Sequence, residues 1–478
     1  MKAGFKAGWM LTLVLAAGMA SGQTRVSRED LVRYMEGELI PGMTVTVMRN
    51  GRLVEQYGLG YADLENKVRM HPDAVLEVGS VTKMYFAALI LRLVEQGKLN
   101  LDAPIGQYLP DLPESHRPLT LRRLLNHTSG AFEYLGGIAD FRRDYSDREL
   151  MEVFLKRPLD YAPGEAWSYS NGGYLLAGQV AAKVTGKGWR ELLQAEVIDR
   201  LGLKETWIQQ VPRLIPRRTR GYALTARGQT NAEPIRPSTG NTAGSILATG
   251  RDVARWAEAW FEGRIARSDI QREAFVPAQL ARGRTFNYGL GWFLDDLGPY
   301  KVAEHGGNTF GYSASLYTVP SERLTVVILT NAAGKNLSGL SARIAAGYLK
   351  GIPTPVAEIV KPDPNPARTD AIREAFLDLI RNGVKSTLID PELQAFGRTQ
   401  RGFQILSAYR TQIGRPLRMQ FLSERKMEAG DTMVNYLVDT AENRLVVSFR
   451  VSADGKLVRI GAEPRGPRPR VRKQTDPA

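Results

Sequence analysis

The sequence contains no cysteine and only four histidines among its 478 residues. Without cysteine, neither a disulfide nor a lipid-modified N-terminal cysteine is possible. The histidines, His71, His116, His127 and His305, are scattered, and no two of them have the spacing of a metal-ligand pair. The sequence therefore predicts no metal and no cofactor, and a fold that depends on its hydrophobic core.

Long hydrophobic runs are also scarce, and the clearest one lies at the N-terminus. Lys2 and Lys6 precede an apolar stretch over residues 7–20, and small residues at 20–22 offer a cleavage site before Gln23. This pattern is typical of a secretory signal peptide over residues 1–22 and is too short to indicate a spanning helix, although a retained anchor is the alternative. We therefore expect an exported protein that is periplasmic or secreted.

Acidic residues are outnumbered, with 50 Asp and Glu against 64 Lys and Arg, so the formal net charge is +14. Much of the local excess lies in the proline-rich residues 465–478, which we expect to form a disordered basic tail. For an exported protein, such a tail favours a cell-wall polymer or another anionic surface as partner, and no nucleic acid is expected. The alternative, that these charges only keep the protein soluble, stays open.

The chain length suggests two or three domains. Strand patterns near both ends of residues 28–350 flank a long helical stretch, which predicts an α+β domain whose antiparallel sheet is flanked by helices. Residues 351–367 contain five prolines and are expected to be a linker. Residues 368–464 predict a small α+β accessory domain with several strands, including one over 403–409.

Ser80 and Lys83 open an apolar helical pattern and are three residues apart, so they lie on one helix face. A serine hydroxyl is a poor nucleophile until a neighbour takes its proton, and burial lowers the pKa of a lysine toward that task. Ser-x-x-Lys alone is a weak signal, because a surface serine and lysine at a helix start give the same pattern.

Two further motifs follow along the chain. Tyr169-x-Asn171 lies in a polar loop that enters a helix, and His305-x-Gly307 precedes Asn308 on a predicted strand. The other histidine near a motif, at position 127, stands beside Thr-Ser-Gly and is interpreted as a hydrogen bonder that fixes a turn.

In this order, the three motifs resemble the active-site motifs of the class C β-lactamase-like serine hydrolases, in the penicillin-binding protein superfamily. The resemblance covers about residues 28 to 350. It implies a β-lactamase/transpeptidase-like fold, with an all-helical subdomain beside the antiparallel sheet.

The resemblance also implies the roles of the site residues. Ser80 would attack a carbonyl, while Lys83 and Tyr169 share its proton. Tyr169, its pKa lowered by Lys83, would be the general base or proton shuttle. Asn171 would hold Lys83 or the substrate amide, and the backbone N–H groups of Ser80 and Asn308 would form the oxyanion hole.

The strand motif bears on the substrate. β-Lactamases of this class usually have Lys-Thr-Gly where this chain has His305-Gly306-Gly307, and His-x-Gly is similar to the variant in family esterases and D-amino-acid peptidases. We therefore expect a serine hydrolase that acts through an acyl-enzyme on a small ester, amide or peptide, with His305 and Gly307 binding the substrate. A β-lactamase or DD-carboxypeptidase, and a non-catalytic wall-binding scaffold, are the alternatives. The accessory domain faintly resembles cystatin-like or NTF2-like modules.

Overall fold

The computed structural model describes residues 25–209, 213–225, 228–233, 236–352, 360–412, 418–440 and 443–467. The signal peptide expected over residues 1–22 lies outside the described residues, as do most of the expected linker and most of the expected basic tail. Two boundaries differ from expectation, because α11 (Pro366–Asn382) begins inside the expected linker and β18 (Leu457–Pro467) runs into the expected tail. Among the described residues, no helix is long and apolar enough to cross a membrane.

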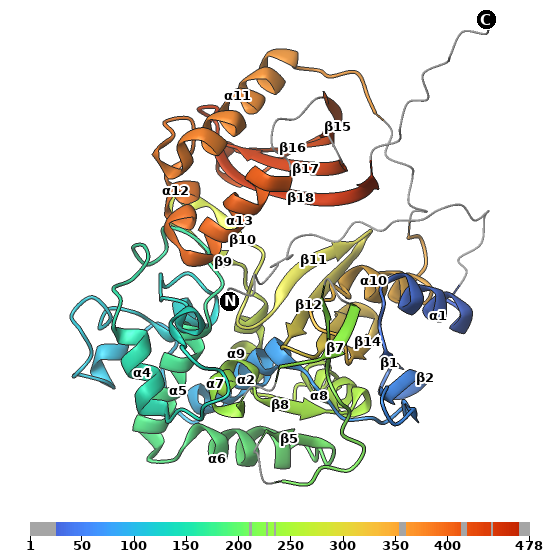
Figure 1. Cartoon of the computed structure of the whole chain (residues 1–478). Coiled ribbons are helices and arrows are strands. Elements are labelled where there is room, and N and C mark those ends of the chain that lie inside the picture. The colour runs from blue at the N-terminus through green and yellow to red at the C-terminus, as the bar shows by residue number, and fades with distance from the viewer. Residues whose placement is uncertain are drawn as a thin grey trace, which may run out of the picture.

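The first domain is built on a seven-stranded sheet in the order β11-β12-β13-β14-β1-β2-β3. Every neighbouring pair is antiparallel, and β1 pairs with β14, so strands from both ends of the domain meet at the centre of the sheet (Figure 1). This confirms the predicted antiparallel α+β sheet. Its strands are β1 (Gly42–Arg49), β2 (Arg52–Asp63), β3 (Val68–Arg69), β11 (Phe293–Leu297), β12 (Tyr300–Asn308), β13 (Ser313–Val319) and β14 (Leu324–Thr330).

Helices cover both faces of this sheet. Val327 and Leu329 of β14 belong to the core shared with α2 (Thr82–Glu95) and α8 (Gly250–Phe261). Val326 and Ile328 point to the opposite face and pack with α1 (Arg28–Gly37) and α10 (Ser338–Ala346). Because side chains alternate along a strand, a strand buried on both faces is mostly apolar, and β14 is apolar except for Thr325 and Thr330.

A helical subdomain packs on the far side of α2, so this helix lies between the subdomain and the sheet. All residues of α2 from Thr82 to Leu91 are buried, including Lys83. The subdomain helices are α3 (Leu121–Leu125), α4 (Asp147–Leu155), α5 (Asn171–Thr185), α6 (Trp189–Leu193) and α7 (Pro237–Gly244), and α9 (Ser268–Arg272) lies nearby. The predicted all-helical subdomain is thereby confirmed.

Short strands complete the first domain. They are β4 (Leu76–Glu77), β8 (Ile246–Ala248) and β5 (Thr206–Ile208) in one small sheet, the hairpin of β6 (Tyr222–Thr225) and β7 (Gly228–Asn231), and the hairpin of β9 (Ala278–Gln279) and β10 (Thr285–Phe286). The last of these hairpins lies against the second domain (Figure 1).

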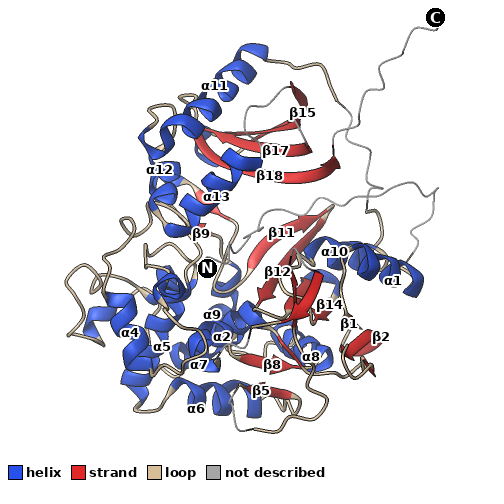
Figure 2. Cartoon of the chain, in the orientation of Figure 1, coloured by secondary structure: helices blue, strands red, loops and turns tan. Residues whose placement is uncertain are grey.

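In the second domain, three helices pack on one face of a four-stranded antiparallel meander (Figure 2). Its elements are α11, α12 (Pro391–Arg398), α13 (Gln400–Gln412), β15 (Arg418–Lys426), β16 (Thr432–Asp439), β17 (Asn443–Val451) and β18. The strand predicted over residues 403–409 was wrong, because this stretch is part of α13. Leu406 and Tyr409 are three residues apart, so they lie on neighbouring positions of one helix face and pack on the core of the domain. The cystatin-like or NTF2-like identity of the domain stays a prediction.

Candidate active site

Ser80 and Lys83 stand at the junction of a 3-10 turn (Gly79–Val81) and α2. Lys83 Nζ lies 3.2 Å from Ser80 Oγ. Ser80 is half-buried, whereas Lys83 is wholly buried. Gly79 has a φ of +52°, and a Cβ at this position would lie 2.8 Å from the backbone nitrogen of Asn308, so the turn requires glycine.

The surroundings of Lys83 favour its uncharged form. The pKa of Lys83 is lowered to about 7, mainly by burial; the Glu133 charge opposes this change and the Arg401 charge contributes to it. The amine also contacts Asn171 Oδ1 at 2.7 Å and the carbonyl oxygen of Ala243 at 3.0 Å. A large share of the lysine is therefore neutral near pH 7 and able to accept a proton.

Tyr169 lies over the same amine, with its ring centre 4.7 Å from Lys83 Nζ. Its buried hydroxyl has no hydrogen bond of good geometry among the described residues, although the Ser80 hydroxyl is near enough to lower its pKa in part. Burial dominates and raises the pKa of Tyr169 well above its usual value. The expectation that the pKa of Tyr169 is lowered was wrong, because desolvation of the phenolate outweighs the effect of nearby charge.

Asn171, at the start of α5, is oriented by Glu133. One carboxylate oxygen of Glu133 accepts hydrogen bonds from the backbone N–H of Asn171 at 2.7 Å and from its side-chain amide at 3.0 Å. The amide oxygen is thereby turned toward Lys83. Nothing in the sequence pattern pointed to Glu133, since it lies in an irregular loop that only tertiary folding brings to Asn171.

Strand β12 approaches the turn that carries Ser80, and the oxyanion hole expected from the backbone N–H groups of Ser80 and Asn308 stays a prediction. A Cβ on Gly307 would lie 1.9 Å from the carbonyl oxygen of Val78 and 3.0 Å from the nitrogen of Ser80. Glycine at position 307 thus lets β12 run directly against the turn that carries Ser80.

His305 lies behind the site rather than on its surface. Its ring is wholly buried, and Nε2 lies 3.0 Å from the Tyr288 hydroxyl. Burial lowers the pKa of His305 to about 3, so the ring is neutral. We therefore assign His305 to the support of Tyr288, and a substrate contact by its side chain stays a prediction.

His127 fixes the loop that carries Tyr169. Its Nδ1 accepts a hydrogen bond of 3.1 Å from the backbone N–H of Ser170, and its ring centre lies 4.3 Å from that of Tyr169. Its Nε2 lies 3.2 Å from the hydroxyl of Tyr288. The contacts agree with the hydrogen-bonding role interpreted from the sequence and extend it to the packing of the site.

The second domain adds a residue that the sequence analysis missed. Arg401, in the first turn of α13, places its guanidinium carbon 5.0 Å from the ring centre of Tyr169. A stretch interpreted as leading into a strand gave no reason to place it here.

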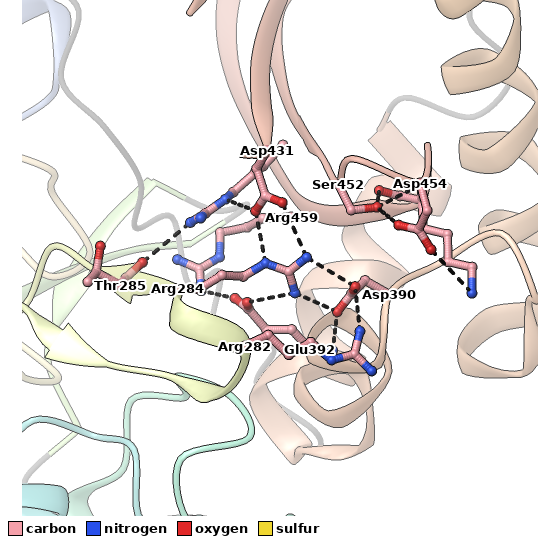
Figure 3. A network of polar contacts seen from close by, with 11 residues as sticks. Arg282, Arg284, Thr285, Asp390, Glu392, Asp431, Ser452, Asp454 and Arg459 are labelled. Atoms are coloured by element: carbon pink, nitrogen blue, oxygen red, sulfur yellow. Dashed lines mark hydrogen bonds and ion pairs between the residues drawn. The ribbon is translucent and has the colours of Figure 1, made fainter. Parts of the chain in front are cut away.

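A buried ionic network joins the two domains beside this site (Figure 3). Arg284, from the β9–β10 hairpin, donates hydrogen bonds of 2.8 Å to both Asp390 and Asp431 of the second domain. Arg450 also pairs with Asp431 at 2.7 Å. Arg284, Asp390 and Asp431 are each at most 5% exposed, so this network is part of a buried domain interface.

The sequence profile of the family described as Beta-lactamase matches residues 28–348. The chain belongs to the beta-lactamase family. Both the fold and the placement of the three motifs agree with this membership. Among the described residues of this beta-lactamase-family protein, no group of three His, Asp or Glu side chains is placed to hold a metal.

Relatives and solved structures extend the comparison. A D-aminopeptidase of Gluconobacter oxydans is 28% identical over 301 residues, which span 61% of this chain and 56% of the relative, little more than half its length. The D-amino acid amidase from Ochrobactrum anthropi SV3, complexed with L-phenylalanine amide, is similar with a TM-score of 0.59 and 26% identity over 66% of this chain and 95% of that one. The octameric penicillin-binding protein homologue from Pyrococcus abyssi matches 90% of this chain and 93% of its own, with a TM-score of 0.61. At 20% identity, this last likeness shows the fold alone.

Proposed function

We propose that this protein is a serine hydrolase that acts through an acyl-enzyme on an ester or amide, of the esterase or D-amino-acid peptidase type. The observation that carries the proposal is the buried Lys83 amine, with a pKa of about 7, at 3.2 Å from the Ser80 hydroxyl. A nucleophile and a neighbouring group able to take its proton are the two parts that covalent catalysis needs.

The reaction follows from these positions. Lys83 takes the proton of Ser80, and Ser80 Oγ bonds to the substrate carbonyl carbon. The negative charge on the carbonyl oxygen is stabilised by the N–H groups of Ser80 and Asn308. Tyr169, which stays a neutral hydroxyl, relays the proton to the leaving alcohol or amine as the bond to it breaks. A water molecule then gives one proton to Lys83 and attacks the acyl carbon. As the bond to Ser80 Oγ breaks, Lys83 returns the proton to Ser80, and the acid is released.

The D-aminopeptidase and D-amino acid amidase relatives support the choice of substrate class. A β-lactamase or DD-carboxypeptidase is the second candidate, favoured by the family profile. We rank it lower because a neutral, buried histidine, His305, stands in place of the strand lysine that is usual in the β-lactamases of this class. A non-catalytic wall-binding scaffold is the remaining alternative.

We further propose that the protein is exported and acts in the periplasm or the medium. The support is the N-terminal pattern of two lysines, an apolar stretch and small residues before Gln23. The basic tail would then meet a cell-wall polymer or another anionic surface.

The test compares the chain from Gln23 onward with its Ser80→Ala variant and with Ser321→Ala, which removes an exposed serine on another loop. Each is assayed with p-nitrophenyl acetate, with D-alanine and L-alanine p-nitroanilides, and with a chromogenic cephalosporin. We expect ester or D-anilide hydrolysis that Ser80→Ala abolishes and Ser321→Ala retains. Cephalosporin hydrolysis alone would favour the second candidate, and activity that survives Ser80→Ala would refute the proposed nucleophile. No turnover of any substrate, together with sacculus binding that requires the tail, would favour the scaffold.

A further inference from the structure

Arg401 brings a positive charge from the second domain to the face of Tyr169. Its side chain is half-buried, and its guanidinium lies 5.0 Å from the ring centre. Within the part of the chain that the structure describes, Arg401 makes no ion pair and its side chain donates no hydrogen bond. Its nitrogens are not among the buried unpaired atoms of the described residues, so the N–H donors of the guanidinium are open to an incoming anion.

The carboxylate whose charge acts on Arg401, that of Glu133, is already hydrogen-bonded to other groups. Glu133 acts on Arg401 through its charge but forms no ion pair with it. Its Oε1 accepts the backbone N–H of Leu135 at 3.1 Å, and its Oε2 holds Asn171. Glu133 therefore orients Asn171, which contacts Lys83, and it does not accept hydrogen bonds from Arg401.

Arg401 is held in place by the residues just before it. Thr399 Oγ1 lies 3.3 Å from Ser168 Oγ, and Arg398 donates a hydrogen bond of 3.2 Å to Glu165. Gln400 packs so closely on Gly136 that a Cβ there would lie 2.0 Å from its side-chain oxygen. Ser168 and Glu165 belong to the loop that carries Tyr169, so the start of α13 is attached to this loop.

The ionic network of Figure 3 also helps to hold α13 against the first domain. Arg284 of the first domain binds Asp390, which caps α12 by accepting the backbone N–H of Glu392 at 2.9 Å. Since α12 leads directly into α13, this contact helps to set the position of Arg401.

We propose that Arg401 is a specificity-determining residue that binds a carboxylate of the substrate attacked by Ser80. This inference rests on the proposed function. A planar guanidinium pairs with a carboxylate through two parallel hydrogen bonds, and the pair is stronger where water is partly excluded. The other basic groups described at the site, Lys83, His127 and His305, have lowered pKa values and are hydrogen-bonded within the protein, so none of them offers a permanent free charge for this anion.

The carboxylate can lie on the acyl side or on the leaving-group side of the scissile bond, and two pairs of esters separate these sources. p-Nitrophenyl hydrogen succinate is compared with p-nitrophenyl valerate, and m-carboxyphenyl acetate with phenyl acetate. The proteins are the full mature chain, Arg401→Gln, Arg401→Lys, and Arg410→Gln as a matched control, since Arg410 is exposed on the same helix.

We expect Arg401→Gln to lower kcat/KM for one of the two anionic esters roughly tenfold to a hundredfold, the loss typical of a hydrogen-bonded charged group. Its neutral counterpart keeps its rate, which also shows that the variant is folded. Arg401→Lys keeps the charge but loses the paired N–H donors of the guanidinium, so its kcat/KM for that ester should be intermediate. Arg410→Gln should match the parent protein. An equal loss for anionic and neutral esters, or no loss for either anionic ester, would overturn the inference.

If no ester is hydrolysed, the proposed hydrolase function fails, but the role of Arg401 can still be tested by measuring the binding of a carboxylate ligand. Ser80→Ala and Ser80→Ala with Arg401→Gln are titrated with N-acetyl-D-alanine by ligand-observed NMR. Binding that disappears with Arg401 supports a carboxylate site. Absent binding, or binding equal in both proteins, refutes it.

Discussion

Lys83 Nζ lies 2.7 Å from Asn171 Oδ1, and this contact orients the lysine amine toward Ser80. A neutral amine has two N–H donors and one lone pair. Asn171 and the carbonyl of Ala243 accept the two N–H groups, so the lone pair is left to face the Ser80 hydroxyl at 3.2 Å. These contacts therefore suit a neutral Lys83 amine whose lone pair points toward the Ser80 hydroxyl, as a proton acceptor requires.

The activity should rise with pH through the pKa of Lys83. That pKa is about 7, so Lys83 is charged and unable to accept a proton below this pH, and neutral above it. We expect kcat/KM for a neutral ester to increase between about pH 6 and 8. Lys83→Arg, which is always charged, should be inactive at every pH, whereas Lys301→Arg, on an exposed residue, should keep the profile. A flat profile in the parent protein would contradict the role of Lys83.

Lys83→Met should stabilise the protein while removing its activity. Burial holds the folded-state pKa near 7 against a reference value of 10.5, so between these values the unfolded chain binds more protons than the folded one. Stability of the parent protein therefore rises with pH across this window. The methionine variant avoids this cost and should gain up to a few kcal/mol at pH 7, with the gain shrinking toward pH 10. Denaturant unfolding of both proteins at several pH values measures it, and a gain that grows with pH would refute the assignment.

Tyr169→Phe tests whether the tyrosine relays protons or titrates as the base. Because burial raises the pKa of Tyr169, the hydroxyl stays neutral at working pH. Its loss should lower kcat roughly a hundredfold or more, the usual contribution of a positioned proton-transfer group. The rise of activity near pH 7 should remain, since it belongs to Lys83. If that rise disappears with Tyr169, the tyrosine is the titrating base.

Glu133→Gln should move the pH profile to lower values. The Glu133 charge raises the pKa of Lys83, so its removal lowers that pKa and shifts the rise in kcat/KM toward acid. The amide of glutamine still offers an oxygen to Asn171, so the fold should persist. Glu152→Gln, on an exposed acid of α4, is the matched control and should leave the profile unchanged. A shift toward alkali, or none, would refute this electrostatic role.

Arg284→Met should weaken the attachment of the second domain. It removes one cation from Asp390 and from Asp431, which are 2% and 1% exposed. Arg282 and Arg450 still contact these carboxylates, so we expect the lower end of the cost of breaking a buried pair, about 3 kcal/mol. Arg282→Met, at a residue 57% exposed, should cost about 1 kcal/mol or less. Calorimetry on both variants checks this, and equal melting temperatures would contradict it.

Local physical chemistry made part of this protein predictable. Ser80 and Lys83 are one helical turn apart, so their proximity follows from helix geometry once a helix start is assigned. The apolar β14 and the glycine at position 307 likewise indicate a buried strand and a close backbone approach. Together with the family resemblance, these features were enough to predict the antiparallel α+β fold and to locate the three motifs in the sequence.

Only the tertiary structure decided the pKa values of the site residues and the contact between Arg401 of the second domain and Tyr169. The direction of the Tyr169 pKa depends on how much water the fold excludes, which no motif spacing encodes. Glu133 and Arg401 reach the site from a distant loop and a separate domain, through contacts with no local periodicity. The sequence by itself therefore determined which groups carry the proposed chemistry, because they are joined by short-range geometry. Their protonation states, and the free cation beside them, were decided by burial and domain docking, because these depend on contacts between segments far apart in the chain.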